Sequence, residues 1–140
     1  MGVSYLCTTL NSGRVITDTD TFFSEGKRRR PDCKVVLMDS DKFKTDADIV
    51  LDPGGASTII SHFSDGQLIS VSGADLEEAA DIAVWVSSLN PDPSLVLWFT
   101  TDNFDGHTAL TPGITPQQVI DQWVDHREHD PYVEYPEYFS

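Results

Sequence analysis

Two histidines near the end of this sequence are candidate metal ligands. His126 and His129 are three residues apart, a spacing at which two imidazoles can bind one metal ion. A zinc site needs a third and usually a fourth ligand, and the nearby carboxylates belong to a region that is acidic throughout. We therefore predict no metal site and no cofactor.

A second group, Asp102, Asp105 and His107, could converge and act in acid–base catalysis. Asp105 and the glycine after it also form a typical two-residue turn between strands, which explains both residues without catalysis. The sequence has no GxSxG nucleophile elbow and no P-loop, and neither cysteine is next to a histidine. We predict no catalytic residues and no enzymatic activity. The alternative is a small enzyme or metal-binding protein that uses this group or the pair His126 and His129.

Two charged runs of the sequence are candidates for binding sites. Residues 39–48 alternate acids as calcium loops do, but Phe43, Lys44 and Val50 stand where such a loop needs a ligand, a glycine and a glutamate. We expect a polar connection between strands there. The basic run 27–30 is predicted to be a solvated turn tip, with an intramolecular role against acidic residues as the alternative. Nucleic acid is not expected as a partner, because the negative charge elsewhere repels phosphate.

Charge is sorted along this sequence. Eight of the nine basic residues precede Thr45 and 17 of the 23 acidic residues follow it, so residues 1–44 sum to +2 and the remaining 96 sum to −16. Such an imbalance governs association with partners rather than the fold. Turns and helix caps account for many acids in the middle of the chain, which leaves residues 121–137 as the unexplained acidic segment.

The segment 121–140 interleaves acids with aromatic side chains. This composition is typical of an interface, because tyrosines contribute contact area at low entropy cost and carboxylates meet arginine and lysine. Pro131 and Pro136 prevent a continuous helix, so we expect an extended tail. In the equal alternative, the tail packs its rings on the domain and exposes only its acids. The predicted partner-binding residues are Asp121, Asp125, Glu128, Asp130, Tyr132, Glu134, Tyr135, Glu137 and Tyr138.

Two helices are predicted to support these groups. The first covers residues 75–89, where an Asp-x-x-Glu cap opens an apolar stretch and Asn-Pro ends it. The second covers residues 116–127, where Thr115 and Gln118 form a capping box and the apolar side chains fall on one stripe. A third helix over residues 20–29 is interrupted by Gly26, and a loop is an equal alternative.

The strands are predicted from β-branched and aromatic runs that flank three tight turns, Ser12-Gly13, Asp65-Gly66 and Asp105-Gly106. The sequence therefore predicts an α+β fold, a mainly antiparallel sheet of about seven or eight strands with two or three helices packed on it. We expect one domain over residues 1–130 and an acidic, aromatic tail over 131–140. The predicted strands cover residues 3–10, 14–17, 33–38, 49–51, 57–63, 67–71, 95–100 and 107–110.

Size and cysteine content fit one cytoplasmic domain. The chain has 140 residues, 39% of them hydrophobic, which is enough to form a core without disulfides or structural metal ions. Cys7 and Cys33 lie in apolar stretches and are predicted to be buried free thiols, with a disulfide as the minority alternative. No signal-peptide run follows Met1 and no apolar stretch reaches the ~20 residues that a bilayer requires, so we expect no membrane partner.

In size, charge and architecture the whole chain resembles the immunity proteins of bacterial polymorphic toxin systems. The stretch from residues 95–99 (LVLWF) to Trp123 looks most like these proteins, although no residue role is carried over from them. The resemblance implies a protein that binds and blocks a basic toxin domain, its cognate toxin, through an acidic surface that contains tyrosines. A structural or adaptor protein in an oligomeric assembly is the other alternative.

Overall fold

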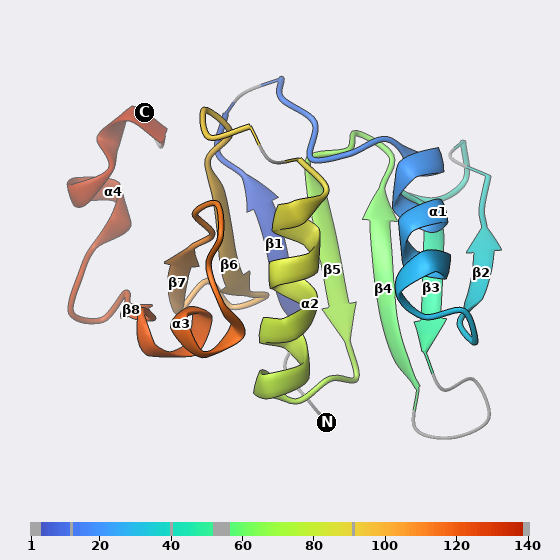
Figure 1. Ribbon diagram of the computed structural model, residues 1–140. Coiled ribbons are helices and arrows are strands. Elements are labelled where there is room, and N and C mark those ends of the chain that lie inside the picture. The colour runs from blue at the N-terminus through green and yellow to red at the C-terminus, as the bar shows by residue number, and fades with distance from the viewer. Residues whose placement is uncertain (1–3, 12, 40, 52–56, 91, 139–140) are drawn as a thin grey trace.

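A computed structural model describes residues 4–138, apart from residues 12, 40, 52–56 and 91. The predicted α+β fold is confirmed: these residues form one eight-stranded antiparallel sheet with helices packed on it (Figure 1). The strands are β1 (Tyr5–Thr9), β2 (Lys34–Leu37), β3 (Thr45–Leu51), β4 (Thr58–Phe63), β5 (Leu68–Ser72), β6 (Leu97–Thr101), β7 (Gly106–Ala109) and β8 (Val124–Asp125). The helices are α1 (Thr19–Arg29), α2 (Leu76–Ser88), α3 (Pro116–Asp121) and α4 (Pro131–Glu134), and a 3-10 turn, η1 (Pro136–Tyr138), follows.

The first strand lies in the middle of the sheet, whose order is β2-β3-β4-β5-β1-β6-β7-β8. Because β1 is antiparallel to both β5 and β6, these two strands run parallel to each other and α2 connects them across the sheet. Figure 1 shows α1, α2 and α3 side by side over the same face. The core lies between these helices and that face, with Ile69, Val71 and Phe99 fully buried on the strands.

The apolar helix α2 is the centre of this layer. The side chain of its N-cap, Asp75, accepts a hydrogen bond from the backbone of Glu78, as the sequence predicts. Helix α2 begins at Leu76, and the acidic residues in its first turn complement the helix dipole. Its buried residues are Ala79, Ala80, Ile82, Ala83, Val86 and Ser87.

The third predicted helix is present as α1. Its N-cap is Asp18, and Phe22 anchors it in the core. Gly26 does not break it, because the helix approaches β3 so closely there that a Cβ on Gly26 would lie 2.2 Å from Cδ1 of Ile49. The residue that argued against a helix in the sequence is the one that lets the helix pack.

The predicted hairpin around Ser12-Gly13 is wrong, although Ser12 itself lies outside the described residues. Residues 14–17 are not a strand, because β5 and β6 occupy both edges of β1 and leave it no free edge for a third partner. Ile16 is nevertheless buried, and its backbone N–H donates to the carbonyl of Gly66 at 2.8 Å. The hairpin at Asp65-Gly66 between β4 and β5 is confirmed, but its connection covers residues 64–67 and is not a two-residue turn.

The predicted two-residue turn at Asp105-Gly106 is also wrong, although β6 and β7 do pair. The reversal occupies residues 102–105, and Phe104 takes the positive φ, 52°. Gly106 already belongs to β7, where a Cβ would lie 2.3 Å from the indole ring of Trp123. Close approach of that ring, not a turn, explains the glycine.

The helix predicted over residues 116–127 is too long. Its capping box between Thr115 and Gln118 is confirmed, but α3 ends at Asp121. The chain then pairs with β7 as the short strand β8, which satisfies the backbone groups at that edge. His126 and His129 are therefore not at a helix end.

Two further predictions concern the strands and the cysteines. The strand predicted at residues 49–51 is longer and begins at Thr45, with an irregularity in its pairing to β4. Cys7 and Cys33 are buried free thiols, as predicted, and burial raises the pKa of the Cys7 thiol to about 12. None of the helices in the described part of the chain is long and apolar enough to cross a membrane.

Candidate functional site

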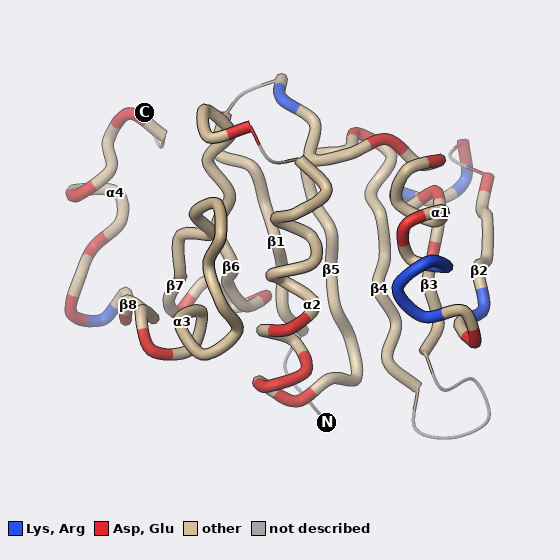
Figure 2. The backbone as a smooth tube through the Cα atoms, viewed as in Figure 1, with Lys and Arg blue, Asp and Glu red and all other residues tan. Residues whose placement is uncertain are grey.

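The charge that is sorted along the sequence is also sorted in space. The sheet order places α1 and β2 at one end of the molecule and residues 97–138, which we call the acidic end, at the other. Figure 2 shows most of the basic segments on α1, β2 and the chain between β2 and β3. Arg127 is the one basic residue of the acidic end, against eight acids: Asp102, Asp105, Asp121, Asp125, Glu128, Asp130, Glu134 and Glu137.

The basic run 27–30 is engaged within the molecule, as the intramolecular alternative proposed. The Arg29 guanidinium lies 2.7 Å from the carboxylate of Asp81 on α2 and 5.8 Å from the ring centroid of Trp85. The Lys27 ammonium donates to the carbonyl oxygen of Cys33. The predicted turn tip is wrong, because residues 27–29 form the last turn of α1, although Arg28 is solvated there with 82% of its side chain accessible.

The predicted partner-binding acids fall into two groups in the structure. Asp121, Glu128 and Glu137 are exposed and form no ion pair with any described residue. The carboxylate of Asp121 accepts a hydrogen bond from Gln117 at 2.9 Å, one turn earlier in α3. These three acids are available to a partner.

The other three predicted acids form contacts within the chain. Asp125 binds the Arg127 guanidinium at 2.8 Å, and hydrogen bonds from Arg127 lower the pKa of Asp125 to about 2. Asp130 caps α4 by accepting from the backbone N–H of Tyr132, and Glu134 lies 3.1 Å from a ring nitrogen of His129. Their carboxylates still add to the negative field of the acidic end.

The tail is not extended as expected. Asp130 as N-cap and Pro131 at the first position start the short helix α4. Tyr135 and Tyr138 are half-buried against Trp98, with ring centroids 5.0 and 6.4 Å away, so the alternative in which rings pack on the domain describes these two. Tyr132, with Phe104 beside it, keeps 59% of its surface exposed.

Under the tail lies a pair of histidines, the buried His107 and the half-buried His126. His107 is 2% exposed and stacks on Trp98 with ring centroids 3.6 Å apart. Nδ1 of His126 donates to the carbonyl of Phe104 at 2.8 Å, so in neutral His126 the other nitrogen accepts from Nδ1 of His107 at 2.9 Å. Burial, and then the nearby His126 and His129, lower the pKa of His107 to about 4.

The two candidate catalytic groups are not assembled. Asp105 lines a pocket on the helix face of the sheet, whereas His107 contacts Trp98 on the opposite face. His126 contacts His107, and His129 contacts Glu134, so the two histidines use different partners. Within the described ranges, no group of three or more His, Cys, Asp or Glu side chains is placed to hold a metal ion.

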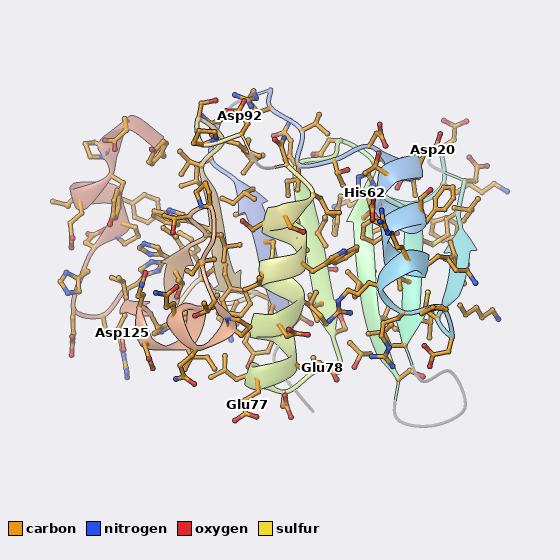
Figure 3. All side chains as sticks on the ribbon, viewed as in Figure 1. Asp20, His62, Glu77, Glu78, Asp92 and Asp125 are labelled. Atoms are coloured by element: carbon orange, nitrogen blue, oxygen red, sulfur yellow. The ribbon has the colours of Figure 1, made fainter. Side chains whose placement is uncertain are left out.

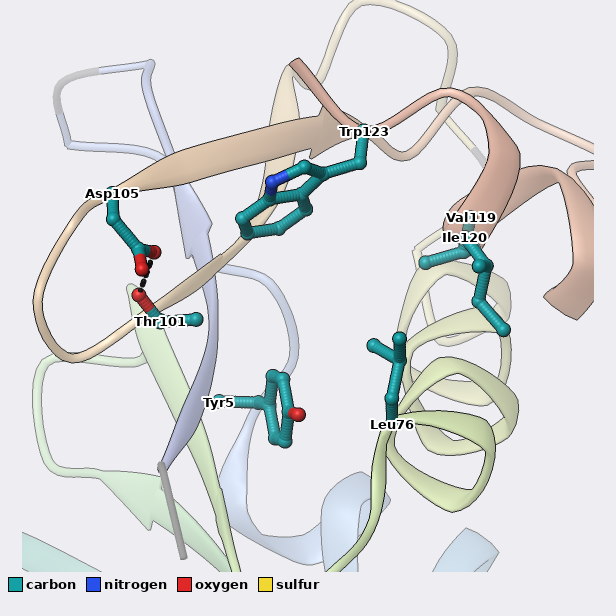
Figure 4. Close-up of a pocket in the computed structure, with 7 residues that line it drawn as sticks. All are labelled: Tyr5, Leu76, Thr101, Asp105, Val119, Ile120 and Trp123. Atoms are coloured by element: carbon teal, nitrogen blue, oxygen red, sulfur yellow. Dashed lines mark hydrogen bonds between the residues drawn. The ribbon is translucent and has the colours of Figure 1, made fainter. Parts of the chain in front are cut away.

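A pocket of about 350 Å³ opens at the acidic end between the sheet, α2 and α3 (Figure 4). Its walls come from segments far apart in the sequence: Tyr5, Leu76, Thr101, Asp105, Val119, Ile120 and Trp123. Most of the lining is apolar, and Leu76 is 40% exposed at its edge. Trp123 is held against Gly106 and forms an edge-to-face contact with Phe99.

The polar side chains that line this pocket include one carboxylate, that of Asp105. The hydroxyl of Thr101 donates to Oδ1 of Asp105 at 2.5 Å. Burial, followed by the carboxylates of Asp75 and Asp105, raises the pKa of Tyr5. The pocket therefore combines aromatic walls with a carboxylate and a neutral phenol.

Sequence reasoning missed this pocket and a second buried histidine. The pocket residues have no common motif, and only the apolar character of Leu76, Ile120 and Trp123 was visible. His62, labelled in Figure 3, lies 2.7 Å from Oδ1 of Asp46 and 2.8 Å from the carbonyl oxygen of Thr17. A lone histidine among the apolar residues of a strand was its only signal.

No family model matches the chain, and no curated protein and no solved structure is similar enough to count as a match.

Proposed function

We propose that this protein binds and blocks a basic protein partner, as an immunity protein neutralises its cognate toxin. The partner is a toxin domain whose positively charged cleft attracts nucleic acid or another polyanion. The separation of charge in space carries the proposal, since eight acids and one arginine occupy the acidic end. The carboxylates would enter the cleft and exclude the polyanion.

The exposed side chains at this end support such a contact. Asp121, Glu128 and Glu137 can meet lysine and arginine, and Tyr132 and Val133 offer apolar area, with 59% and 72% of their surface exposed. Charge complementarity of this kind speeds association and disfavours partners of the same sign.

The proposed action is binding alone, without catalysis, metal or cofactor. Nucleic acid and anionic membrane surfaces are not proposed as partners, because the acidic end repels phosphate. We place the protein in the cytoplasm, where a reducing environment suits the buried free thiols Cys7 and Cys33.

The proposal is tested with the toxin domain encoded by the gene next to that of this protein. Production of both proteins should restore the growth that the toxin domain alone prevents. Calorimetry with the purified pair should show an affinity that falls as salt rises from a low to a near-physiological concentration. Absence of a complex, or an affinity that does not depend on salt, would contradict the proposal.

A further inference from the structure

The pocket at the acidic end has the volume of a ligand-binding site. Its volume of about 350 Å³ falls within the range of roughly 300–1,000 Å³ that is usual for ligand sites. Figure 4 shows Tyr5, Leu76 and Trp123 around one open space, with the carboxylate of Asp105 at its side. An occupant must match both the apolar walls and the carboxylate.

Charge decides which occupants fit. An anion would be repelled by Asp105 and by Asp75, whose carboxylates act together on the phenol of Tyr5. A neutral apolar group would cover Asp105 without pairing it, which costs free energy. A cation on an apolar stem satisfies both the carboxylate and the walls.

The aromatic walls favour arginine over lysine. A guanidinium is planar and weakly hydrated, stacks on aromatic rings and binds a carboxylate through two parallel hydrogen bonds. The rings of Tyr5 and Trp123 supply stacking surfaces. Oδ1 of Asp105 accepts from Thr101, and the carboxylate keeps further lone pairs for a guanidinium.

The surroundings of the pocket favour the side chain of a protein over a free small molecule. Three wall residues are each followed in the sequence by an exposed acid: Glu77 follows Leu76, Asp102 follows Thr101 and Asp121 follows Ile120. A basic surface around an inserted side chain would meet these acids, whereas a small ligand would not reach them.

We propose that this pocket receives one arginine side chain of the basic partner. Its stem packs along Leu76, Ile120 and Trp123, and its guanidinium pairs with Asp105. The inference rests on the proposed function, to which it adds the chemical group that anchors the complex.

The probe for this site is N-acetyl-L-argininamide, titrated into the full chain at low salt. The indole N–H resonance of Trp123 should shift and saturate. The matched citrulline amide, which has the same shape without the charge, should bind at least about tenfold more weakly. Equal binding of the two amides, or no shift at Trp123, would overturn the proposal.

Variants locate the cation within the protein. Asp105→Asn keeps an oxygen for the Thr101 hydroxyl but removes the charge, and should weaken binding of the arginine amide about tenfold. Asp102→Asn is the control, since this exposed acid of the same loop does not line the pocket. Leu76→Gln, at the exposed edge, should weaken binding about threefold through the loss of apolar contact. If the Asp105→Asn variant binds the arginine amide as tightly as the Asp102→Asn variant, the proposal is overturned.

The pocket and the proposed function can fail separately. A toxin complex that keeps its affinity in Asp105→Asn, but loses it when Asp121, Glu128 and Glu137 are neutralised, would overturn the pocket and leave the function. Arginine binding at Trp123 without any salt-dependent toxin complex would overturn the function instead.

Discussion

At the scale of single residues, two buried histidines of the sheet, His62 and His107, connect it to segments that lie outside it. His62 joins the chain before α1 to the sheet, because its ring nitrogens reach the carbonyl of Thr17 and the carboxylate of Asp46. His107 supports the aromatic contacts under the tail through Trp98 and His126. Neither residue needs a role in chemistry to explain its burial.

His62→Ala should lower the free energy of unfolding by about 2–4 kcal/mol, because it removes the hydrogen bonds of the ring with Thr17 and Asp46 and opens a cavity beside Phe22. Urea denaturation measures the change. His129→Ala is the control, since its side chain is 52% exposed, and should change stability by less than about 0.5 kcal/mol. A loss for His62→Ala as small as that of the control would contradict this role.

The depressed pKa of His107 predicts a pH dependence. Between pH 6.5 and about pH 4 the unfolded chain binds a proton that folded His107 does not bind. The free energy of unfolding should therefore fall as the pH falls through this window, by up to about 3 kcal/mol from this residue, and this contribution should level off below it.

The contribution of His107 is measured with His107→Phe, which keeps an aromatic ring against Trp98 but cannot take up a proton. Denaturation at several pH values should give a shallower fall between pH 6.5 and 4 than in the unchanged protein. His129→Gln serves as the exposed control. A fall as steep in His107→Phe as in the unchanged protein would rule out this residue as the source.

At the scale of elements, the chain after α3 contacts β7 closely through Trp123, which also forms part of the pocket wall. A Cβ at Gly106 would lie 2.3 Å from the indole ring, which is rigid and packed on Phe99. The chain after α3 is thereby held against the sheet and pairs with β7 as β8.

Gly106→Ala should therefore destabilise the protein by about 1–3 kcal/mol through overpacking and should change the fluorescence of Trp123. Thermal or chemical denaturation of a double-mutant cycle with Trp123→Leu separates the causes. If the ring is the obstacle, Gly106→Ala costs much less in the Trp123→Leu background. An equal cost in both backgrounds would show that the contact is not responsible.

Local signals predicted the elements well where neighbours in the sequence decide them. The capping box at Thr115 and the Asp75 cap marked helix starts correctly, and the Asp65 turn marked a hairpin. Signals failed where distant segments decide. Residues 14–17 have strand composition but no free strand edge, and Gly106 looks like a turn residue because the ring of Trp123 is far away in the sequence.

The same reason hid the candidate site. The sequence located acids available to a partner, such as Asp121 and Glu128, because charge density is visible without a fold. It could not show that Tyr5, Leu76 and Asp105 line one pocket, since three separate elements or loops supply them. Nor could it show that the ring of Tyr135 packs against Trp98 of the sheet.

At the scale of the whole molecule, sheet order turns a gradient of charge along the chain into two ends of different charge. Residues 19–44 supply α1 and β2 at one end, and residues 97–138 supply the other. Figure 3 shows Asp20 and Asp125 at these opposite ends. The central claim is that the acidic end steers a basic partner. Acids at this end must therefore raise the association rate more than the same number of acids elsewhere.

The most direct test compares two triple variants with the same change of charge. One is Asp121→Asn, Glu128→Gln and Glu137→Gln at the acidic end. The other neutralises exposed acids at the opposite end: Asp20→Asn, Asp39→Asn and Asp41→Asn.

The measurement is the association rate constant with the toxin domain as a function of salt. The account predicts that the acidic-end variant associates about tenfold more slowly at low salt with a shallower salt dependence, whereas the control stays within about twofold of the unchanged protein. Equal rates for the two variants would contradict it.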